Sequence, residues 1–478
     1  MSNKKVITWC MIASFAYAFP ILTSPVLYGD DMGRSLLGYS LWGGIGRPLA
    51  DYVMNILSFG TQMVDMSPLP QALGVACMAL TSAMLCHRIG ITSGLYAFII
   101  SILLIGNPFF LANLSFKFDA FPMCLSVLIS YTAVHMLYHK VYRFFSPLLV
   151  LSSLSLYQAS LPIFMLSVVI IAVHMALKWD GKAEILTFIT YAILSLSIGY
   201  VIYSHFIASV FLTDPYSIKH SGITFDISKV YNNILLYIDL IWKMINGWQL
   251  FAFGLLAFSS VFSSTTLAYK YLSKSDKDTW SAVASLIVML CPFIAAALSI
   301  LPLIFLENPV VTPRVFIGMS MMLVSWFIVV ILATKKKAAW FSALPVCMFM
   351  FVFCFAFTNA NKQQFEFEKE IASKIGDDVS EMEGSASLDQ IIFSGREPMS
   401  PLLRAAYMKF PVMYAFVPQH MNPTSWVGYI TLRHNAFTER LGWHKGKIED
   451  GAIDSMQCKD RVVYCIGLVD KVVVVRFK

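Results

Sequence analysis

Long apolar runs alternate with short polar gaps along the first 358 residues of the chain. A helix of about 20 residues crosses the hydrocarbon core of a membrane. The pattern therefore predicts about eleven transmembrane helices. We expect them at residues 6–27, 68–86, 90–106, 120–138, 144–157, 159–177, 185–211, 248–268, 280–302, 315–333 and 338–358. The run at 144–157 is short and continues into the next through "SLSLYQASLP", which favours a broken pair.

The polar gaps alternate in character, and this alternation predicts the orientation. One set is short and basic, at residues 2–5, 87–88, 139–143, 178–182, 269–278 and 334–337. Lys and Arg concentrate in cytoplasmic loops, so we expect this set and the N-terminus in the cytoplasm. The other set is longer and lies outside, at residues 28–67, 107–119, 212–247 and 303–314. Residues 359–478 are then extracytoplasmic.

Composition supports a membrane protein. Of 478 residues, 58% are apolar and only 13% are charged, whereas soluble domains average about 25% charged residues. The net charge of +7 follows largely from the basic gaps, so it does not require an acidic partner such as nucleic acid. The first apolar run is too long for a signal-peptide core and lacks a small-residue cleavage site, so we expect no cleaved signal.

The last 120 residues have a soluble composition and predict a small C-terminal α/β domain, 359–478, beside a transmembrane domain, 1–358. "QQFEFEKEIASKIG" and "SPLLRAAYMKF" predict helices, "LDQIIFSG" a strand and "RVVYCIGLVDKVVVVRF" two strands. Cys458 and Cys465 flank this β-rich sequence and are the only cysteines of the tail. In an oxidising compartment they should form a disulfide; two unlinked thiols are the alternative.

Asp30 and Asp31 are adjacent acids directly after the first apolar run, and Arg34 and Arg47 follow in the same loop. One interpretation is helix capping, since Asp is a good N-cap and "SLLGYSLW" could form an interfacial helix. A single Asp suffices for a cap, however. Adjacent carboxylates repel each other, which suits one of them to accept a proton as a general base.

Five further polar residues stand in or beside the outer loops. Lys117 and Asp119 precede the fourth apolar run, and Arg314 begins the tenth from the outside. Tyr157 and Gln158 lie at the predicted helix break, where irregular backbone is tolerated only beside protein or a wet cavity. The alternatives are an ordinary helix flank for Lys117 and Asp119, and contact with lipid headgroups for Arg314.

Several motifs of other enzyme classes are missing from the sequence. No GxxxxGK[ST] phosphate loop occurs, which argues against ATP-driven work, and no HExxH occurs. The "GGIG" stretch lacks the spacing of a dinucleotide-binding fingerprint. A DxD at 276–278 lies in a short Lys-rich gap with no soluble domain around it, so we interpret it as a solvated loop.

The stretches "YGDDMGRSLLGYSLWGGIGRPLADYVMNILSFG" and "NPFFLANLSFKFDAFPM" resemble the phage-encoded, serotype-converting O-antigen glucosyltransferases of the Gtr type II family. "SLSLYQASLP" and "TPRV" add to this resemblance, which covers most of residues 1–360. It implies a fold like that of the type-C glycosyltransferases. It also implies transfer of glucose from undecaprenyl-phosphate glucose to a sugar of the O-antigen, on the periplasmic side of the bacterial inner membrane.

The resemblance assigns roles to the candidate residues. The first outer loop of such enzymes carries acidic catalytic residues, which map onto Asp30 and Asp31 without deciding between them. The departing lipid phosphate gains negative charge, so Arg314, Lys117, Arg34 and Arg47 are candidates to hold it. Asp119, Tyr157, Gln158 and the aromatic residues Tyr39, Trp42 and Trp248 are candidates for substrate contact. No metal or other cofactor is required by this chemistry, although a divalent metal is compatible with it.

Two other classes of function stay open on the sequence alone. A transporter or flippase of lipid-linked sugars is compatible with eleven helices, but it would favour ionisable residues in mid-span and internal repeats. The predicted spans hold few such residues, mainly histidines near helix ends, and no repeat is evident. An acyltransferase would favour a His-centred cytoplasmic site, and His87 and His139 have no evident partners in the sequence.

Overall fold

The computed structural model describes residues 3–275, 278–334, 338–383, 388, 390–436, 441–446 and 448–478. The basic segment 335–337 and the first residue of the DxD therefore lie outside the described residues. The chain divides into two compact units. The first consists of Met1–Thr23, Ser40–Gln62 and Met66–Cys354, and the second of Ser24–Tyr39, Met63–Asp65 and Phe355–Lys478.

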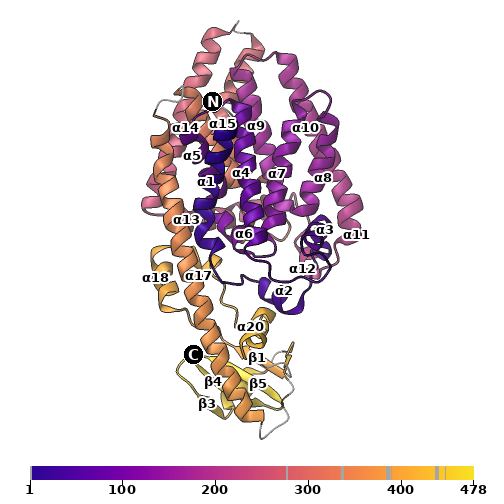
Figure 1. Ribbon diagram of the computed structural model, residues 1–478, viewed down its shortest axis with the longest axis vertical. Coiled ribbons are helices and arrows are strands. Elements are labelled where there is room, and N and C mark those ends of the chain that lie inside the picture. The colour runs from indigo at the N-terminus through magenta and orange to yellow at the C-terminus, as the bar shows by residue number, and fades with distance from the viewer. Residues whose placement is uncertain are drawn as a thin grey trace. The chain divides into compact units, whose positions relative to one another are not determined.

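Long apolar helices make up the first unit (Figure 1). Within the described part of the chain, eight helices are long and apolar enough to cross a membrane. They contain α1 (Asn3–Leu22), α4 (Leu69–Ile89), α7 (Ala120–Leu137), α9 (Leu161–Leu177), α10 (Lys182–Ile202), α14 (Trp248–Lys274), α15 (Thr279–Ile304) and α17 (Trp340–Glu383). The span with α9 begins at Gln158, and the span with α10 continues to Phe211. This is the architecture of a polytopic membrane protein.

The remaining predicted spans correspond to less regular helices. α5 (Gly94–Ile105) is followed by the helical segment Pro108–Ser115, which contains α6 (Leu111–Ser115), after a bend of 60°. Counted as one broken span, this pair is the ninth. α8 (Ser146–Leu156) and α16 (Gly318–Ala333) are apolar but shorter. Every predicted run thus coincides with a helix, while the count of eleven membrane crossings stays a prediction.

Small and hydroxyl-bearing residues bring the helices of the first unit together. A Cβ at Gly74 would lie 3.0 Å from the carbonyl oxygen of Ala120, so α4 and α7 approach closely there. Ser14 of α1 and Ser101 of α5 share a buried hydrogen bond of 3.0 Å. Ser130 and Ser153 do the same between α7 and α8, at 2.7 Å. Close backbone approach and interhelical hydroxyl bonds are typical of membrane helix packing.

Two helix boundaries differ from the prediction. α1 ends at Leu22, not near residue 27, because Pro25 disfavours helical geometry at the residue before it. Residues 24–39, which follow the helix, belong to the second unit. At the other end, α17 continues without a break from Trp340 to Glu383, about 25 residues past the predicted end of the span.

A five-stranded mixed sheet forms the centre of the second unit, in the order β2-β1-β5-β4-β3. The strands are β1 (Gln390–Ser394), β2 (Gly442–Trp443), β3 (Cys458–Asp460), β4 (Tyr464–Val469) and β5 (Val472–Phe477). β1 pairs in parallel with β2 and β5, whereas β3, β4 and β5 are antiparallel. The predicted strand at β1 and the predicted pair β4 and β5 are confirmed.

The C-terminal half of α17 covers one face of this sheet. Its residues Ile371, Ile375 and Val379 are buried in one cluster with Ile391, Phe393, Tyr464, Ile466, Val473 and Val475. The opposite face is covered around Ile453, from α21 (Asp450–Ser455), which packs against Ile392 and Val474. Both faces of β1 and β5 are therefore buried, which explains their continuous apolar sequence.

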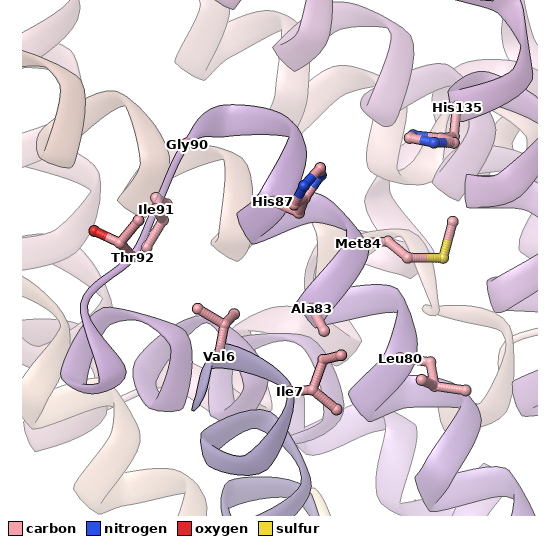
Figure 2. Close-up of a pocket in the computed structure, with 10 residues that line it drawn as sticks. All are labelled: Val6, Ile7, Leu80, Ala83, Met84, His87, Gly90, Ile91, Thr92 and His135. Atoms are coloured by element: carbon pink, nitrogen blue, oxygen red, sulfur yellow. The ribbon is translucent and has the colours of Figure 1, made fainter. Parts of the chain in front are cut away.

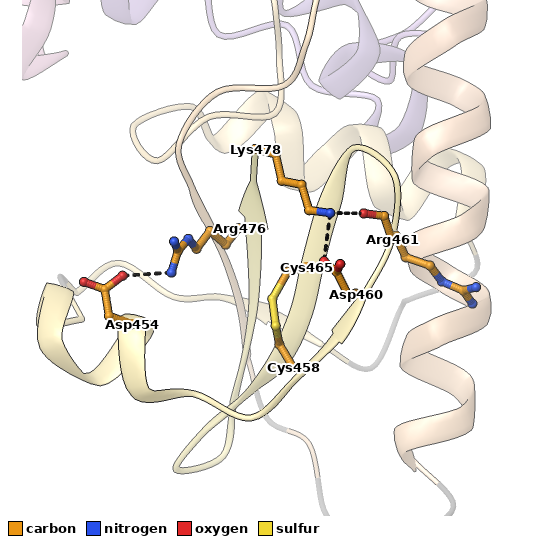
Figure 3. The surroundings of a disulfide bond; sticks show 7 residues. All are labelled: Asp454, Cys458, Asp460, Arg461, Cys465, Arg476 and Lys478. Carbon is orange, nitrogen blue, oxygen red and sulfur yellow. Dashed lines mark hydrogen bonds and ion pairs between the residues drawn. A yellow bond between two sulfur atoms is a disulfide. The ribbon is translucent and has the colours of Figure 1, made fainter.

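A disulfide joins Cys458 to Cys465 and links β3 to β4 (Figure 3), with a Cα–Cα distance of 5.8 Å. The neighbouring chain end is held by Lys478, whose Nζ donates to the carbonyl oxygen of Arg461 at 2.6 Å and pairs with Asp460 at 2.8 Å. Arg476 of β5 pairs with Asp454 of α21 at 2.8 Å. Lys478 therefore ties the last residue to the turn between β3 and β4, and Arg476 ties β5 to α21.

A buried acid pair in the second unit predicts an unusual pH dependence of stability. Glu368 of α17 pairs with His420 at 2.7 Å, and Glu397 is buried beside them. Burial raises the pKa of Glu397 well above its ordinary value of 4.5, and the charge of Glu368 raises it further. The folded protein therefore retains a proton that the unfolded chain releases above about pH 4.5. The contribution of Glu397 to the free energy of unfolding consequently falls as the pH rises above about 4.5.

Glu397→Gln is expected to remove the loss of stability that the buried carboxyl of Glu397 causes at high pH. The unfolding temperature of the full-length variant in detergent should exceed that of the wild type at pH 8, and the difference should shrink toward pH 4.5. Thermal unfolding followed by tryptophan fluorescence at several pH values measures it. Glu366→Gln, an exposed position on α17, is the matched control. A constant difference between Glu397→Gln and wild type at all pH values would contradict the proton assignment.

Candidate active site

Asp30 and Arg34 form an ion pair on one short helix of the second unit. Asp30 is the N-cap residue of α2 (Asp31–Leu37), and Gly38 ends the helix with a left-handed backbone (φ 69°). The carboxylate of Asp30 does not cap the helix; it accepts a hydrogen bond from Nη1 of Arg34, one turn later. Asp30 thus occupies the N-cap position, but its side chain does not form the capping hydrogen bond of the first interpretation. Arg34 orients the carboxylate instead.

The two adjacent acids differ in access to solvent. The side chain of Asp30 is 39% exposed, whereas Asp31 is fully buried. Tyr39 lies beside them, with its hydroxyl 3.5 Å from the carbonyl oxygen of Asp30 and its ring 5.5 Å below the guanidinium of Arg34. Burial raises the pKa of Tyr39 to about 12, so its hydroxyl remains a neutral donor at physiological pH. Of the two acids, only Asp30 can meet an incoming hydroxyl without rearrangement.

Arg47 and Asp119 form a second, buried ion pair, in the first unit. Arg47 precedes α3 (Pro48–Leu57) and Asp119 precedes α7, so the pair joins the starts of two helices. The contact is bidentate, at 2.8 and 2.5 Å, and Nε of Arg47 donates to the carbonyl oxygen of Leu156 at 2.6 Å. This geometry favours a structural role for Arg47 and Asp119 over the substrate contacts predicted for them.

Tyr157 and Gln158 extend this polar cluster at the break between α8 and α9. The ring of Tyr157 lies 4.7 Å from the guanidinium carbon of Arg47. Gln158 donates to the carbonyl oxygen of Gly46 at 3.2 Å and to the hydroxyl of Tyr203 at 2.6 Å. Gly46 has φ +78°, and a Cβ there would meet the Tyr203 hydroxyl at 2.9 Å. Gln158 therefore holds a tight turn that requires glycine.

Asp51 is a structural residue that the sequence reasoning missed. Its carboxylate accepts hydrogen bonds from the backbone amides of Trp42, at 3.0 Å, and Gly43. Its place in the first turn of α3 was the available signal, because acids concentrate at helix starts. The side chain of Trp42 is fully buried here, which leaves no ring face for the sugar contact predicted for it.

Arg314 and Lys117 lie on adjoining segments of the first unit. The guanidinium of Arg314 lies over the ring of Phe116, 5.8 Å from its centroid, and Lys117 follows Phe116 directly. The backbone of Arg314 is held independently of its side chain, because its carbonyl oxygen accepts from Asn113 at 3.1 Å and from Tyr157 at 3.0 Å. Two cations are thus placed near each other, one of them on a backbone fixed by neighbouring helices.

Replacing Asp119 by Ala is expected to destabilise the protein by about 3–5 kcal/mol, because the buried Arg47 would lose its carboxylate. The unfolding midpoint of the full-length protein in detergent, with added denaturant, measures this loss. Asp239→Ala is the control, since that acid forms an exposed ion pair with Lys243 within one helix. Equal midpoints for the Asp119 and Asp239 variants would show that the buried pair contributes little.

A cavity of about 290 Å³ opens in another part of the first unit, between α1, α4 and α7 (Figure 2). Its lining is largely apolar, with Val6, Ile7, Leu80 and Met84 among its residues, and it includes His87 and His135. None of the predicted site residues lines it. Its lining residues include no acid that could orient an imidazole, and the one hydroxyl among them is that of Thr92. This lining does not favour an acyltransferase.

The apolar helices of the first unit are those of a polytopic membrane protein. The family model described as "Glucosyl transferase GtrII" matches residues 19–331. The chain therefore belongs to the GtrII glucosyl transferase family, and it is a glycosyltransferase by that membership.

One curated relative extends the likeness over almost the whole chain. It is described as an uncharacterized 55.3 kDa protein in the gtrB 5' region of Salmonella phage P22. The two chains are 29% identical over 474 residues, which covers 96% of each. The likeness therefore includes the C-terminal residues that the family model leaves out. No solved structure matches the chain.

Proposed function

We propose that this protein transfers glucose from undecaprenyl-phosphate glucose to a sugar of the O-antigen, on the periplasmic side of the bacterial inner membrane, and thereby causes serotype conversion. The observation that carries the proposal is the exposed carboxylate of Asp30, oriented by Arg34, on a chain that belongs to a glucosyl transferase family. The relative from a Salmonella phage makes Salmonella O-antigen the first acceptor to test.

The proposed reaction exchanges one bond at the sugar. The bond between glucose C1 and the phosphate oxygen breaks, and the phosphate keeps the electron pair. The acceptor hydroxyl oxygen bonds to C1, and its proton passes to the carboxylate of Asp30. The sugar passes through an oxocarbenium-like state, as in glycoside hydrolysis. This scheme needs no metal or other cofactor.

Cations assist because the leaving group gains charge as the reaction proceeds. The donor phosphodiester carries one negative charge, and the released monoester carries about −1.5 to −2. Groups that hold the phosphate therefore bind the transition state more tightly than the donor. We assign this role to Arg314 and Lys117. Arg34 has a different role, because its guanidinium orients Asp30.

The proposed orientation follows the distribution of Lys and Arg. The basic gaps lie in the cytoplasm with the N-terminus, and residues 24–39 and the C-terminal sheet lie in the periplasm. The disulfide between Cys458 and Cys465 supports this side for the sheet, because disulfides persist in the periplasm and not in the cytosol.

Transfer by the purified full-length protein tests the proposal. The protein in lipid nanodiscs is mixed with undecaprenyl-phosphate carrying radiolabelled glucose and with O-antigen from Salmonella. We expect label to move to the polysaccharide, and no transfer with boiled protein. A flippase would instead move the labelled lipid between the leaflets of proteoliposomes without transferring the sugar. That result, with no transfer to any O-antigen tried, would overturn the proposal.

A further inference from the structure

The helix α2, at whose start the acids lie, packs against a helix from the far end of the chain. α20 (Trp426–Ala436) belongs to the same unit, and its Ile430 is buried in a cluster with Leu27 and Met32. The hydroxyl of Thr431 lies 3.1 Å from the sulfur of Met32. α20 therefore fixes the position of α2, and with it the position of Asp30.

Trp426, the first residue of α20, reaches the backbone of α2 at Gly33. A Cβ at Gly33 would lie 2.6 Å from Cη2 of Trp426 and 2.6 Å from the hydroxyl oxygen of Tyr39. Only a glycine leaves room for both aromatic side chains at this point. Gly33 lies between Asp30 and Arg34 in the chain, so the indole edge comes within one helical turn of the ion pair.

The two aromatic rings form a surface that is open on one side. The centroids of Tyr39 and Trp426 are 6.4 Å apart, and the ring planes are inclined at 45°. Trp426 is 42% exposed, in contrast to the fully buried Trp42. The exposed part of this indole is an apolar surface available to a ligand. The carboxylate of Asp30 and the Tyr39 hydroxyl supply polar groups at its border, and the buried Arg34 pairs with that carboxylate.

This combination matches the chemistry of a pyranose ring. One face of a pyranose presents C–H groups, which pack on an aromatic ring, while the hydroxyl groups at the rim form hydrogen bonds with carboxylates and phenols. A lipid chain would cover the carboxylate of Asp30 without offering it a hydrogen-bond donor. The border of charged groups therefore favours a sugar over a lipid tail as the occupant.

From these contacts we infer that Trp426, with Tyr39, is the binding surface for the acceptor sugar beside Asp30. A pyranose of the acceptor polysaccharide stacks on the indole, and its reacting hydroxyl is thereby presented to the carboxylate. The C-terminal segment is thus a part of the acceptor site. This inference rests on the proposed function, since it assigns the acceptor of that transfer to one set of residues.

Steady-state transfer by full-length variants in nanodiscs tests the inference, with O-antigen concentration and donor concentration varied separately. Trp426→Ala is expected to raise the KM for O-antigen by about tenfold or more, to leave the KM for undecaprenyl-phosphate glucose unchanged, and to leave the unfolding temperature near that of the wild type. Trp426→Phe should restore most of the acceptor affinity, because it retains a ring. Tyr407→Ala, another half-exposed aromatic residue of the same unit, is the control.

Gly33→Ala supplies an independent arm, because its Cβ displaces the indole and the phenol. It should also raise the KM for O-antigen. In the double variant with Trp426→Ala, the increase in this KM should be smaller than the product of the two single increases. An unchanged acceptor KM in Trp426→Ala, or an equal loss in Trp426→Phe and Trp426→Ala, would overturn the inference. A rise in the donor KM alone would assign the surface to the lipid instead. Failure of the wild type to transfer glucose would overturn the proposed function first, and is distinguishable from all of these.

Discussion

Glucose transfer is expected to fall about 10²–10⁴-fold when Asp30 is replaced by Asn, which is the range that general-base assistance contributes. The substitution keeps the size of the side chain and its hydrogen bond from Arg34, but the amide cannot take the acceptor proton. Because the side chain of Asp30 is partly exposed and Asn keeps an oxygen that accepts from the buried Arg34, the variant should fold. The measurement is kcat of the purified variant at saturating donor and acceptor.

Asp31 separates the catalytic role from a structural one. Its side chain is fully buried, so Asp31→Asn is expected to lower the unfolding temperature more than Asp30→Asn does, and to lower kcat less. Asp239→Asn, an exposed acid on α13 (Ile227–Ile245), is the control for general effects of charge removal. If Asp30→Asn retained full turnover while Asp31→Asn lost it, the base would be the buried acid.

Arg314→Ala is expected to lower kcat about 10²–10³-fold, the cost of removing one donor to a developing oxyanion. Arg314→Lys should recover part of the loss, since a single ammonium cannot form the bidentate contact of a guanidinium with phosphate. The fold should be retained, because the contacts from Asn113 and Tyr157 go to the backbone carbonyl of residue 314 and not to its side chain.

Arg143 offers a matched control for Arg314. Its guanidinium also lies over an aromatic ring, that of Tyr191, at 4.5 Å, but it belongs to a basic gap and not to the candidate site. Arg143→Ala should therefore leave kcat and the donor KM unchanged. Equal losses in the Arg143 and Arg314 variants would indicate a general need for positive charge, and would remove the assignment of Arg314 to the leaving phosphate.

The apolar helices were predictable from the sequence because their signal is local. Each of the runs that we predicted coincides with a helix, since about 20 consecutive apolar residues leave few alternatives. The strands β4 and β5 were predictable for the same reason, as apolar runs separated by a short turn at Asp470. The helix predicted at 363–376 is confirmed as part of α17. Its joining to the predicted span at 338–358 without a break was not predicted, because the change from apolar to polar composition after residue 358 resembles a helix end.

The candidate site depended on contacts that no local pattern reveals. Arg47 and Asp119 are 72 positions apart, and neither has a sequence feature that names the other as its partner. Trp426 comes nearly 400 positions after Gly33, and the clash that requires glycine there is visible only in three dimensions. The sequence does not distinguish Trp42 from Trp426. In the structure the side chain of Trp42 is fully buried, whereas that of Trp426 is partly exposed.

The side of the membrane that α2 faces is the claim on which the proposed chemistry depends, and labelling of a single cysteine tests it. Leu37, at the end of α2, is 47% exposed, whereas the native free cysteines are buried and Cys458 and Cys465 are disulfide-bonded. The Leu37→Cys variant in intact bacteria with a permeabilised outer membrane should react with a membrane-impermeant maleimide. Labelling only after the inner membrane is disrupted would place α2 in the cytoplasm and contradict the account.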